Sequence, residues 1–158
     1  RLKSWIETLK GYGLEPSSVI RGNWDAQSGY AGALQMLRET PNFSAVLVGN
    51  DQMALGVLSA FHQHQVAVPG EKSVIGYDDT YESSFFYPAL STVSLDLDLQ
   101  GKEAVRRILA STSGAPHTSS ILPARLVIRH SSGARIEQGK DLQAIAEQLR
   151  AIAHRLAP

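Results

Sequence analysis

The chain has 158 residues, with fifteen Lys and Arg side chains against fifteen Asp and Glu, and it contains no cysteine. This length fits one domain that is large enough to bury a core, and the lack of cysteine excludes a disulfide scaffold, a thiolate metal site and a thiol nucleophile. A net charge of zero argues against a nucleic-acid-binding surface on this stretch, because phosphate binding requires a basic one.

The first forty residues carry two helical patterns. Apolar side chains recur at three- and four-residue spacings over residues 2–9, and the glycines within 11–13 end that helix. A short strand is predicted at 18–20, followed by a helix that Asp25 caps and Pro41 ends. Because the sequence opens inside a helical pattern without a preceding cap, we expect this chain to be a piece of a longer protein.

The middle of the chain alternates buried strands with a helix. Residues 43–49 form a continuous apolar run, typical of a strand that is buried on both faces, and a helix is predicted from Asn50 to Phe61. A second apolar run, 73–77, predicts another buried strand. Strands that alternate with helices across short loops predict an α/β fold, with a parallel sheet covered by helices.

Periodicity weakens after the second buried strand, over residues 81–98. A helix is predicted at 99–109 and a strand at 121–128, and the polar stretch 130–140 indicates a linker. The tail beyond it repeats apolar residues at spacings of 3, 4, 3 and 4, which is the seam of a coiled coil. About two heptads are marginal as an isolated coil, but four copies together can bury such a seam. The seam consists of Leu142, Ile145, Leu149, Ile152 and Leu156.

Polar side chains follow both predicted buried strands at their carboxyl ends, where open parallel sheets bind ligands. Asn50 follows the first strand and Asp78 the second, and an amide with a carboxylate can together bind vicinal hydroxyls. Trp24, just before a predicted helix, offers the apolar platform that a sugar ring prefers. A structural interpretation stays open, in which Asn50 and Asp51 are helix caps and Asp79 shapes a turn.

No catalytic or metal-binding pattern stands out. Asp78 and Asp79 are adjacent at a strand end and so point to different sides, which disfavours the paired carboxylates of a glycosidase. His62 and His64 lie two residues apart on a predicted helix and face away from each other, so we expect no metal site. No run approaches the roughly 18 apolar residues that a membrane-spanning helix needs. We therefore expect a protein that is not an enzyme, with no cofactor and no membrane partner.

Phe85, Phe86 and Tyr87 form an aromatic cluster in the irregular segment. Packing into the core is one interpretation of this cluster. A subunit interface is the other, because large aromatic side chains concentrate at the centres of interfaces. The residues alone leave both interpretations open.

Two runs make the sequence recognisable, VGNDQMALG at 48–56 and SVIGYDDT at 73–80. Together with Gly22-Asn23-Trp24, they resemble the LacI/GalR family of sugar-responsive bacterial repressors, and the match continues to Pro123. The heptad tail, which only some members have, strengthens the resemblance. It implies a periplasmic-binding-protein-like (type I), doubly wound α/β core of two subdomains. An inducer would bind in the cleft between them, and a helix-turn-helix headpiece would lie outside this chain.

The resemblance also implies a division of the chain and its partners. Residues 1–96 would form the C-terminal subdomain of the effector-binding core, 97–129 would return to the N-terminal subdomain, 130–140 would be the linker, and 141–158 the oligomerisation helix. The implied partners are a small sugar or glycoside inducer, operator DNA through the headpiece, and further copies of the chain in a homodimer and a homotetramer, in the cytoplasm. The alternative is a sugar-binding receptor for transport, which shares the fold but gains nothing from an oligomerising tail.

Carried over position by position, the ligand contacts of the family fall on Arg1, Trp24, Asn50 and Asp78. The resemblance implies that Arg1, Asn50 and Asp78 contact sugar hydroxyls and that Trp24 stacks on the sugar ring. The argument from strand ends reaches Asn50 and Asp78 independently. This agreement favours a binding role for both residues.

Two implied cleft positions depart from a family member that has such a tail. Leu95 and Leu97 stand where that member has a glutamine and a phenylalanine, and Gln100 stands where it has a leucine. Loss of an amide and an aromatic ring is expected to change which sugar fits. Phe85 and Phe86 fall where the family forms its dimer interface, which favours the interface interpretation.

Overall fold

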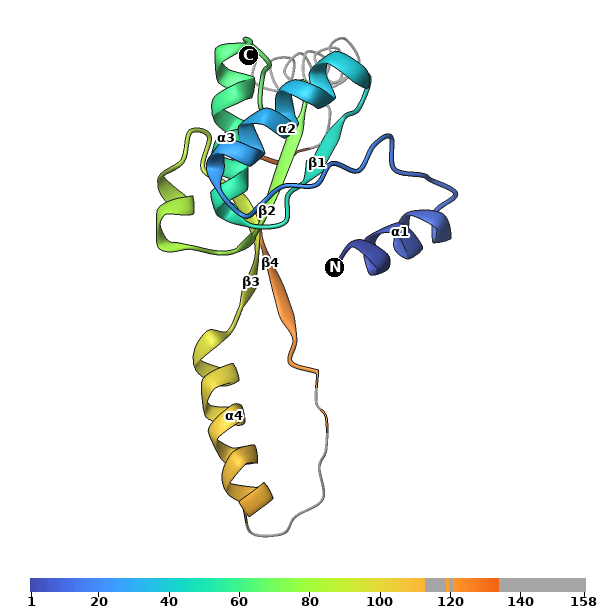
Figure 1. Cartoon of the computed structure of the whole chain (residues 1–158). Coiled ribbons are helices and arrows are strands. Elements are labelled where there is room, and N and C mark those ends of the chain that lie inside the picture. Colours follow the sequence, from blue (N-terminus) through green and yellow to red (C-terminus); the bar gives the residue numbers. More distant parts are fainter. Residues whose placement is uncertain (113–118, 120, 134–158) are drawn as a thin grey trace, which may run out of the picture.

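Four strands form one mixed sheet at the centre of the chain (Figure 1). The computed structural model describes residues 1–112, 119 and 121–133. The strands are β1 (Ala45–Leu47), β2 (Ser73–Asp78), β3 (Ser91–Leu95) and β4 (Ala124–Val127). They lie in the order β1-β2-β3-β4, with β1, β2 and β3 parallel and β4 antiparallel to β3. The predicted parallel α/β sheet is present, with one antiparallel strand added at its edge.

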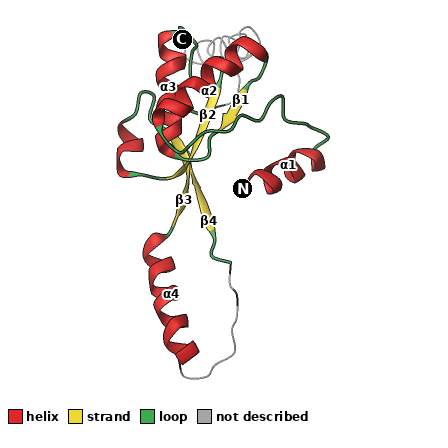
Figure 2. Cartoon of the chain, viewed as in Figure 1, coloured by secondary structure: helices red, strands yellow, loops and turns green. Residues whose placement is uncertain are grey.

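Helices cover one face of this sheet and extend beyond it. They are α1 (Leu2–Gly11), α2 (Ala26–Glu39), α3 (Asp51–Gln63), the short 3-10 helix η1 (Tyr81–Phe85) and α4 (Leu97–Thr112). Helices α2 and α3 lie side by side on the sheet, whereas α4 projects from the far end of β3 (Figure 2). Asp25 caps α2 as predicted, because its carboxylate accepts a hydrogen bond from the Ser28 amide at 2.7 Å.

Two glycines bring the backbones of α2 and α3 into contact. A Cβ atom on Gly56 would lie 1.8 Å from the carbonyl oxygen of Ala26. One on Gly29 would lie 2.0 Å from the carbonyl oxygen of Met53. A side chain does not fit at such distances, so the close approach of the two helices requires glycine at both positions.

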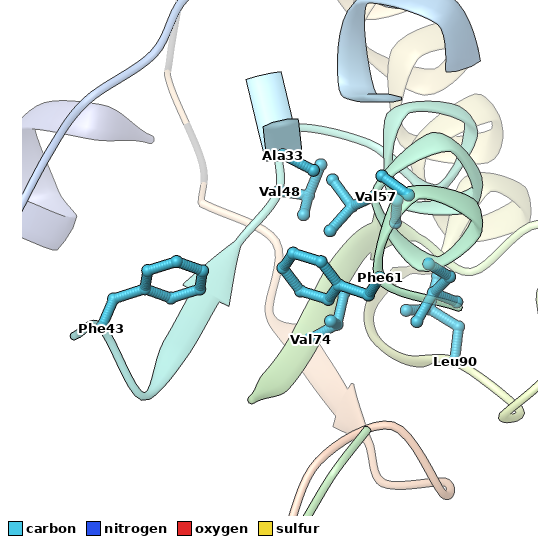
Figure 3. Close-up of a cluster of buried hydrophobic side chains, with 10 residues drawn as sticks. Ala33, Phe43, Val48, Val57, Phe61, Val74 and Leu90 are labelled. Carbon is cyan, nitrogen blue, oxygen red and sulfur yellow. The ribbon is translucent and has the colours of Figure 1, made fainter. Parts of the chain in front are cut away.

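The hydrophobic core lies between these two helices and the strands β1 and β2 (Figure 3). Phe61 of α3 is fully buried, and its ring centre lies 6.1 Å from that of Phe43. Val74 of β2 and Leu90, just before β3, are also fully buried. Because complete burial of one such side chain contributes about 1.5–3 kcal/mol, this cluster stabilises the covered face of the sheet.

The first predicted strand is shorter and more exposed than expected. β1 has 3 residues where the apolar run spans 43–49, and Leu47 is 45% exposed. β1 is an edge strand, and α2 and α3 cover only one of its faces, so the prediction of burial on both faces is wrong. The run is apolar because Phe43 and Val48 are buried in the core, with Val46 packed against it.

The structure differs from the sequence prediction at two further strands. Residues 18–20 form no strand, because no described strand pairs with them and supplies ladder hydrogen bonds. β3, in contrast, lies within 81–98, where the periodicity is weak. Its first residues, Ser91 and Thr92, are fully buried, and their hydroxyls are hydrogen-bonded inside the protein. Hydrogen-bonded hydroxyl groups therefore replace the apolar side chains by which a buried strand is recognised.

Residues 130–133, expected to begin the linker, pack against the sheet instead. Ser131 is fully buried, and its hydroxyl donates to the carbonyl oxygen of Val74 at 2.6 Å and accepts from the amide of Ser91 at 2.8 Å. Hydrogen bonds rather than apolar side chains hold this segment on the sheet. Because the segment is polar, the sequence analysis assigned it to the linker, and that predicted start at residue 130 is wrong. The rest of the predicted linker and the predicted oligomerisation helix lie outside the described residues. That helix includes Leu142, Ile145, Leu149, Ile152 and Leu156.

Candidate functional site

The carboxyl ends of β1 and β2 are joined by the first residue of the chain, whose position beside the sheet is marked N in Figure 1. The guanidinium group of Arg1 donates to the carbonyl oxygen of Gly49 at 2.8 Å and lies 3.6 Å from a carboxylate oxygen of Asp78. It also lies 3.6 Å from the centre of the Tyr77 ring, a contact that the sequence did not suggest. Arg1 thus bridges two neighbouring strand ends, where open parallel sheets bind ligands.

Asn50 caps α3 and is also tied to Trp24. Its side-chain oxygen accepts a hydrogen bond from the Met53 amide at 2.9 Å, and its side-chain nitrogen donates to the Trp24 carbonyl oxygen at 3.0 Å. The structural role that the sequence left open is therefore present. An amide nitrogen has two donors and an amide oxygen has two lone pairs, so the chemistry of Asn50 allows further hydrogen bonds. Trp24 itself is 63% exposed.

Asp78 ends β2 with an unusual backbone conformation. Its φ angle is +113°, and that of Asp79 is +57°. Backbone conformations that are rare for residues other than glycine cost of the order of 1–3 kcal/mol each and cluster at functional sites. Burial raises the pKa of the Asp78 carboxyl above its usual value, the Arg1 charge lowers it, and the Asp51 charge raises it. A carboxylate at a strand end, with a strained backbone and a shifted pKa, is a candidate binding group.

A buried carboxylate supports the turn after Asp78 from the side of α3. Asp51 is 1% exposed, and its carboxylate accepts hydrogen bonds from the Thr92 hydroxyl at 2.6 Å and from the Thr80 amide at 2.9 Å. The sequence predicted a helix cap here, but the cap is Asn50, and Asp51 joins α3 to β3 and to the loop after β2. An acidic residue in the first turn of a helix is common, so the sequence did not signal this role.

An ion pair supports the same turn from the side of β4. Nη2 of Arg129 lies 2.6 Å from a carboxylate oxygen of Asp79, and Nη1 donates to the Ser83 hydroxyl at 3.1 Å and to the Leu90 carbonyl oxygen at 2.8 Å. Asp79, predicted to shape a turn, takes part in this ion pair. The two partners are 50 residues apart in the sequence. No short-range pattern could therefore have identified Arg129.

The two predicted leucines lie at the end of β3 and at the start of α4. Leu95 is the last residue of β3, one residue beyond Ser94, which pairs with Asp78 in the β2–β3 ladder. Leu97 is the first residue of α4 and is 68% exposed. The end of β3 therefore lies beside the end of β2, and Leu97 begins the helix that leads away from it.

The aromatic cluster is divided between core and surface. Phe86 packs partly buried against the hydrophobic core, whereas Phe85 is 72% exposed in η1. The ring of Tyr81 lies 5.4 Å from that of Phe85 and is also exposed. Packing into the core therefore describes Phe86, and the interface interpretation of Phe85 stays a prediction.

As a set, Arg1, Trp24, Asn50 and Asp78 offer hydrogen-bond donors, acceptors and an exposed aromatic side chain; Arg1 contacts the Asp78 carboxylate, and Asn50 bonds to the Trp24 carbonyl oxygen. Such a combination suits a ligand with several hydroxyl groups and an apolar face. Among the described residues, no three His, Cys, Asp or Glu side chains gather so that they could hold a metal ion. No helix in this part of the chain is long and apolar enough to cross a membrane.

The sequence and the fold match a known class of proteins. The family description "Periplasmic binding protein-like domain" matches residues 1–132. The chain therefore belongs to this family, and the predicted fold class is confirmed.

Individual relatives narrow this assignment. The chain is 41% identical over 158 residues to the lactose operon repressor of Klebsiella pneumoniae, covering 99% of this chain and 44% of that protein. It is 36% identical, with the same coverage, to the lactose operon repressor of Escherichia coli K12. A crystal structure of the lac repressor dimer bound to operator and the anti-inducer ONPF matches 85% of this chain and 47% of that chain, with a TM-score of 0.81 and 38% identity. The chain spans less than half the length of these relatives.

Within the family of periplasmic binding protein-like domains, these relatives place the chain among the LacI/GalR repressors. The resemblance that the runs at 48–56 and 73–80 indicated is thereby confirmed. The relatives named above are repressors.

Proposed function

We propose that this chain is the C-terminal part of the effector-binding core of a sugar-responsive, cytoplasmic repressor, and that it is not an enzyme. The observation that carries the proposal is the contact of Arg1 with both strand ends: it donates to the carbonyl oxygen of Gly49, the residue before Asn50, and lies 3.6 Å from the Asp78 carboxylate. Its family membership supports the same conclusion, since one solved lac repressor structure contains operator and ONPF and another contains ONPG. The ligand proposed here is a small sugar or glycoside.

The proposed division of the chain into two subdomains is based on α4, which projects away from the sheet. We propose that residues 1–96 form one subdomain of the core and that the segment from 97 up to the start of β4 returns to a second subdomain, most of which is supplied by chain outside this sequence. The predicted end of that segment at 129 is too late, because β4 pairs with β3 and Arg129 contacts Asp79 and Leu90. The exposed apolar side chains of α4 support this division, because Ile108 is 64% and Leu109 62% exposed on a helix without a buried residue. The tail, 141–158, is proposed as the oligomerisation helix.

The proposed mechanism uses unequal affinity of the sugar for two arrangements of the subdomains. Asp78 accepts hydrogen bonds from sugar hydroxyls, Arg1 and Asn50 donate to them, and Trp24 stacks on the ring. A ligand that also touches the second subdomain favours one orientation and so changes operator affinity through a headpiece outside this chain. Coupling of this kind typically amounts to about 1–3 kcal/mol.

Two apolar residues are proposed to set the sugar preference. Leu95 and Leu97 lie at the end of β3 and the start of α4, beside the strand end that carries Asp78. Leucine side chains at these positions form no hydrogen bonds, so a polar sugar substituent that would need a hydrogen-bonding partner there is disfavoured. We therefore propose a ligand whose substituent next to β3 is apolar.

Assembly is proposed to involve two separate surfaces. The exposed ring of Phe85, supported by the half-buried Phe86, is proposed to lie in a homodimer interface, as large aromatic residues do in many interfaces. The heptad tail is proposed to join two dimers into a homotetramer.

Intrinsic tryptophan fluorescence of the full-length protein tests the sugar site. The protein is titrated with a panel of galactosides, glucosides and other small sugars, and Trp24→Phe is the control because Trp5 also emits. We expect a saturable change that disappears in Trp24→Phe. We also expect Asp78→Asn to abolish sugar binding without loss of the fold. Unchanged sugar affinity in Asp78→Asn contradicts the site, and no response to any sugar contradicts the function.

Operator binding distinguishes the repressor from the transport receptor. A repressor binds its operator, and the sugar that shifts the fluorescence changes that affinity. A receptor binds the sugar and no operator. A gel-shift titration with and without the sugar gives the answer.

A further inference from the structure

The turn at Asp78 and Asp79 needs support from outside itself. Both residues have positive φ angles, which are uncommon for side-chain-bearing residues and persist only when the surroundings hold them. The Asp78 carboxylate is the acidic group of the proposed sugar site, so its position depends on whatever holds this turn. Arg1 contacts the Asp78 carboxylate itself, and three further contacts support the turn: the pairing of Asp78 with Ser94, the bond from Thr80 to Asp51, and the ion pair with Arg129.

Of these three contacts, only the ion pair is made by a residue that follows β4. Arg129 follows β4, and its backbone amide donates to the Ser91 hydroxyl at 2.9 Å, which fixes its place on the sheet. Its guanidinium group then spans Asp79, the Ser83 hydroxyl and the Leu90 carbonyl oxygen. Side-chain exposure is 20% for Arg129 and 18% for Asp79, so the pair is largely shielded from water. A shielded, multiply bonded arginine holds its partner more firmly than an exposed ion pair does.

We propose that Arg129 is a positioning residue for the Asp78 carboxylate in the proposed sugar site, acting through Asp79. Arg129 does not touch the ligand. It holds Asp79 in the left-handed conformation, and the neighbouring Asp78 then presents its carboxylate toward Arg1. This inference rests on the proposed function and adds to it a residue, 51 positions beyond Asp78 in the printed sequence, that determines sugar affinity.

Removal of either partner tests the proposal in the full-length protein, with ONPG and lactose as the probes. We expect Arg129→Met and Asp79→Asn each to weaken binding about tenfold, which is what loss of one charge-assisted hydrogen bond is typically worth. Asparagine tolerates a positive φ as well as aspartate does, so Asp79→Asn removes the charge without disfavouring the turn. The double variant is expected to bind no more weakly than either single variant, because both remove the same interaction.

A second ion pair in the chain supplies the matched control. Arg107 lies 2.7 Å from a carboxylate oxygen of Glu103 on α4, with side-chain exposures of 27% and 21%. Arg107→Met removes the same charge from a comparably shielded pair away from the turn. We expect it to leave ONPG and lactose affinity unchanged. A conservative change, Arg129→Lys, keeps the charge but lacks the guanidinium fork, so we expect it to restore binding only in part.

Amide hydrogen exchange without ligand separates positioning from a general loss of stability. In Arg129→Met, we expect faster exchange confined to residues 78–85, with α3 as protected as in the unmodified protein. Exchange that rises equally in α3 would show a merely structural role and overturn the proposal. Unchanged ONPG and lactose affinity in both Arg129→Met and Asp79→Asn would also overturn it. If the unmodified protein binds neither these probes nor any other sugar of the panel, the proposed function fails, and local exchange at 78–85 still decides whether Arg129 holds the turn.

Discussion

Two parts of the molecule differ in what holds them in place. In the packed layer, formed by α2, α3, β1 and β2, Phe61 and Val74 are fully buried and two helices touch through their backbones. In the arm, formed by α4 and β4, no residue is buried. The packed layer is stabilised by contacts between residues distant in the sequence. The ion pairs within α4, such as Lys102 with Asp98, instead join residues one turn apart.

The comparison shows what the arm lacks. Val105, Ile108 and Leu109 are each more than half exposed, and their spacing of three and four residues places them on one stripe of α4. Helices in proteins gain most of their stability from packing such a stripe against another element. In the proposed repressor, this stripe is the surface that the second subdomain covers.

The largest effect is expected from truncation of a side chain in the packed layer. Phe61→Ala removes a fully buried ring and is expected to lower the free energy of unfolding by about 3–5 kcal/mol. Ile108→Ala on the arm is the control, and we expect it to change that free energy by less than about 0.5 kcal/mol in this chain. Urea denaturation measures both values. In the full-length protein the cost of Ile108→Ala should rise, and equal costs in the two proteins would contradict the proposed covering of α4.

The contact between α2 and α3 gives the next effect. Gly56→Ala places a Cβ atom 1.8 Å from the Ala26 carbonyl oxygen, so the helices must separate. We expect a loss of about 3 kcal/mol, at the upper end of what overpacking usually costs. The urea midpoint gives the loss, and the change in α2 amide protection locates it. A midpoint unchanged by this methyl group would show that the two helices are not packed this closely.

Removing the buried charge at the start of α3 is expected to cost about 1.5–3 kcal/mol. One carboxylate oxygen of Asp51 accepts from the Thr92 hydroxyl and the other from the Thr80 amide. Asp51→Asn keeps the shape of the side chain but replaces one of these two acceptors with an NH2 group, which cannot accept. Asp98→Asn on the arm is the matched control, since its side chain is 78% exposed. Thermal unfolding of the two variants should separate them clearly. Equal melting temperatures would mean that the hydrogen bonds of Asp51 do not stabilise the contact between α3 and the turn at Asp78 and Asp79.

Sugar affinity is expected to depend on pH through Asp78. The ionised carboxylate accepts hydrogen bonds from hydroxyls, so affinity should fall about tenfold for each pH unit below its pKa. Because burial raises that pKa, the fall should begin at a higher pH than for an ordinary Asp, whose pKa is about 3.9. Calorimetric titration with ONPG across pH 4–7 measures it, and affinity that stays constant down to about pH 4 contradicts the assignment.

The pH dependence of folding stability checks the raised pKa of Asp78 independently. Sugar affinity is expected to fall as the pH falls, whereas the contribution of Asp78 to stability is expected to fall as the pH rises. A carboxyl whose pKa is higher in the folded state than in the unfolded state binds its proton longer when folded. The contribution of Asp78 to stability is therefore present at low pH and is lost as the pH rises through the raised pKa. The difference in unfolding free energy between the unmodified protein and Asp78→Asn should follow this direction.

The contrast also explains how far the sequence could predict the structure. Helix α2 and strand β2 were predictable because local signals, the cap at Asp25 and the apolar run at 73–77, agree with the packing. β3 was not, since its buried Ser91 and Thr92 are paired with groups about forty residues away. A hydroxyl that is satisfied by a distant partner looks the same in a sequence as one that faces water.

The candidate site shows the same limit. Asn50 and Asp78 could be predicted, because residues at the carboxyl ends of parallel strands meet at one edge of the sheet. Tyr77 and Arg129 could not, because their roles come from contacts with Arg1 and Asp79 that only the folded chain creates. Sequence patterns therefore identified groups at the ends of elements, and the structure was needed to find what holds those groups in place.

The smallest effect is expected on the arm and has the opposite sign. A Cβ atom on Gly101, within α4, would have no neighbouring atom within 4 Å beyond its own stretch of helix, so Gly101→Ala meets no steric obstacle. Alanine loses less backbone freedom than glycine when a helix forms, which should raise the free energy of unfolding by about 0.5–1 kcal/mol. This is the same chemical change as Gly56→Ala, so the two variants compare the arm with the packed layer directly. A loss of stability in Gly101→Ala would mean that the arm is packed against another part of the chain at this position, and the contrast between the two parts would fail there.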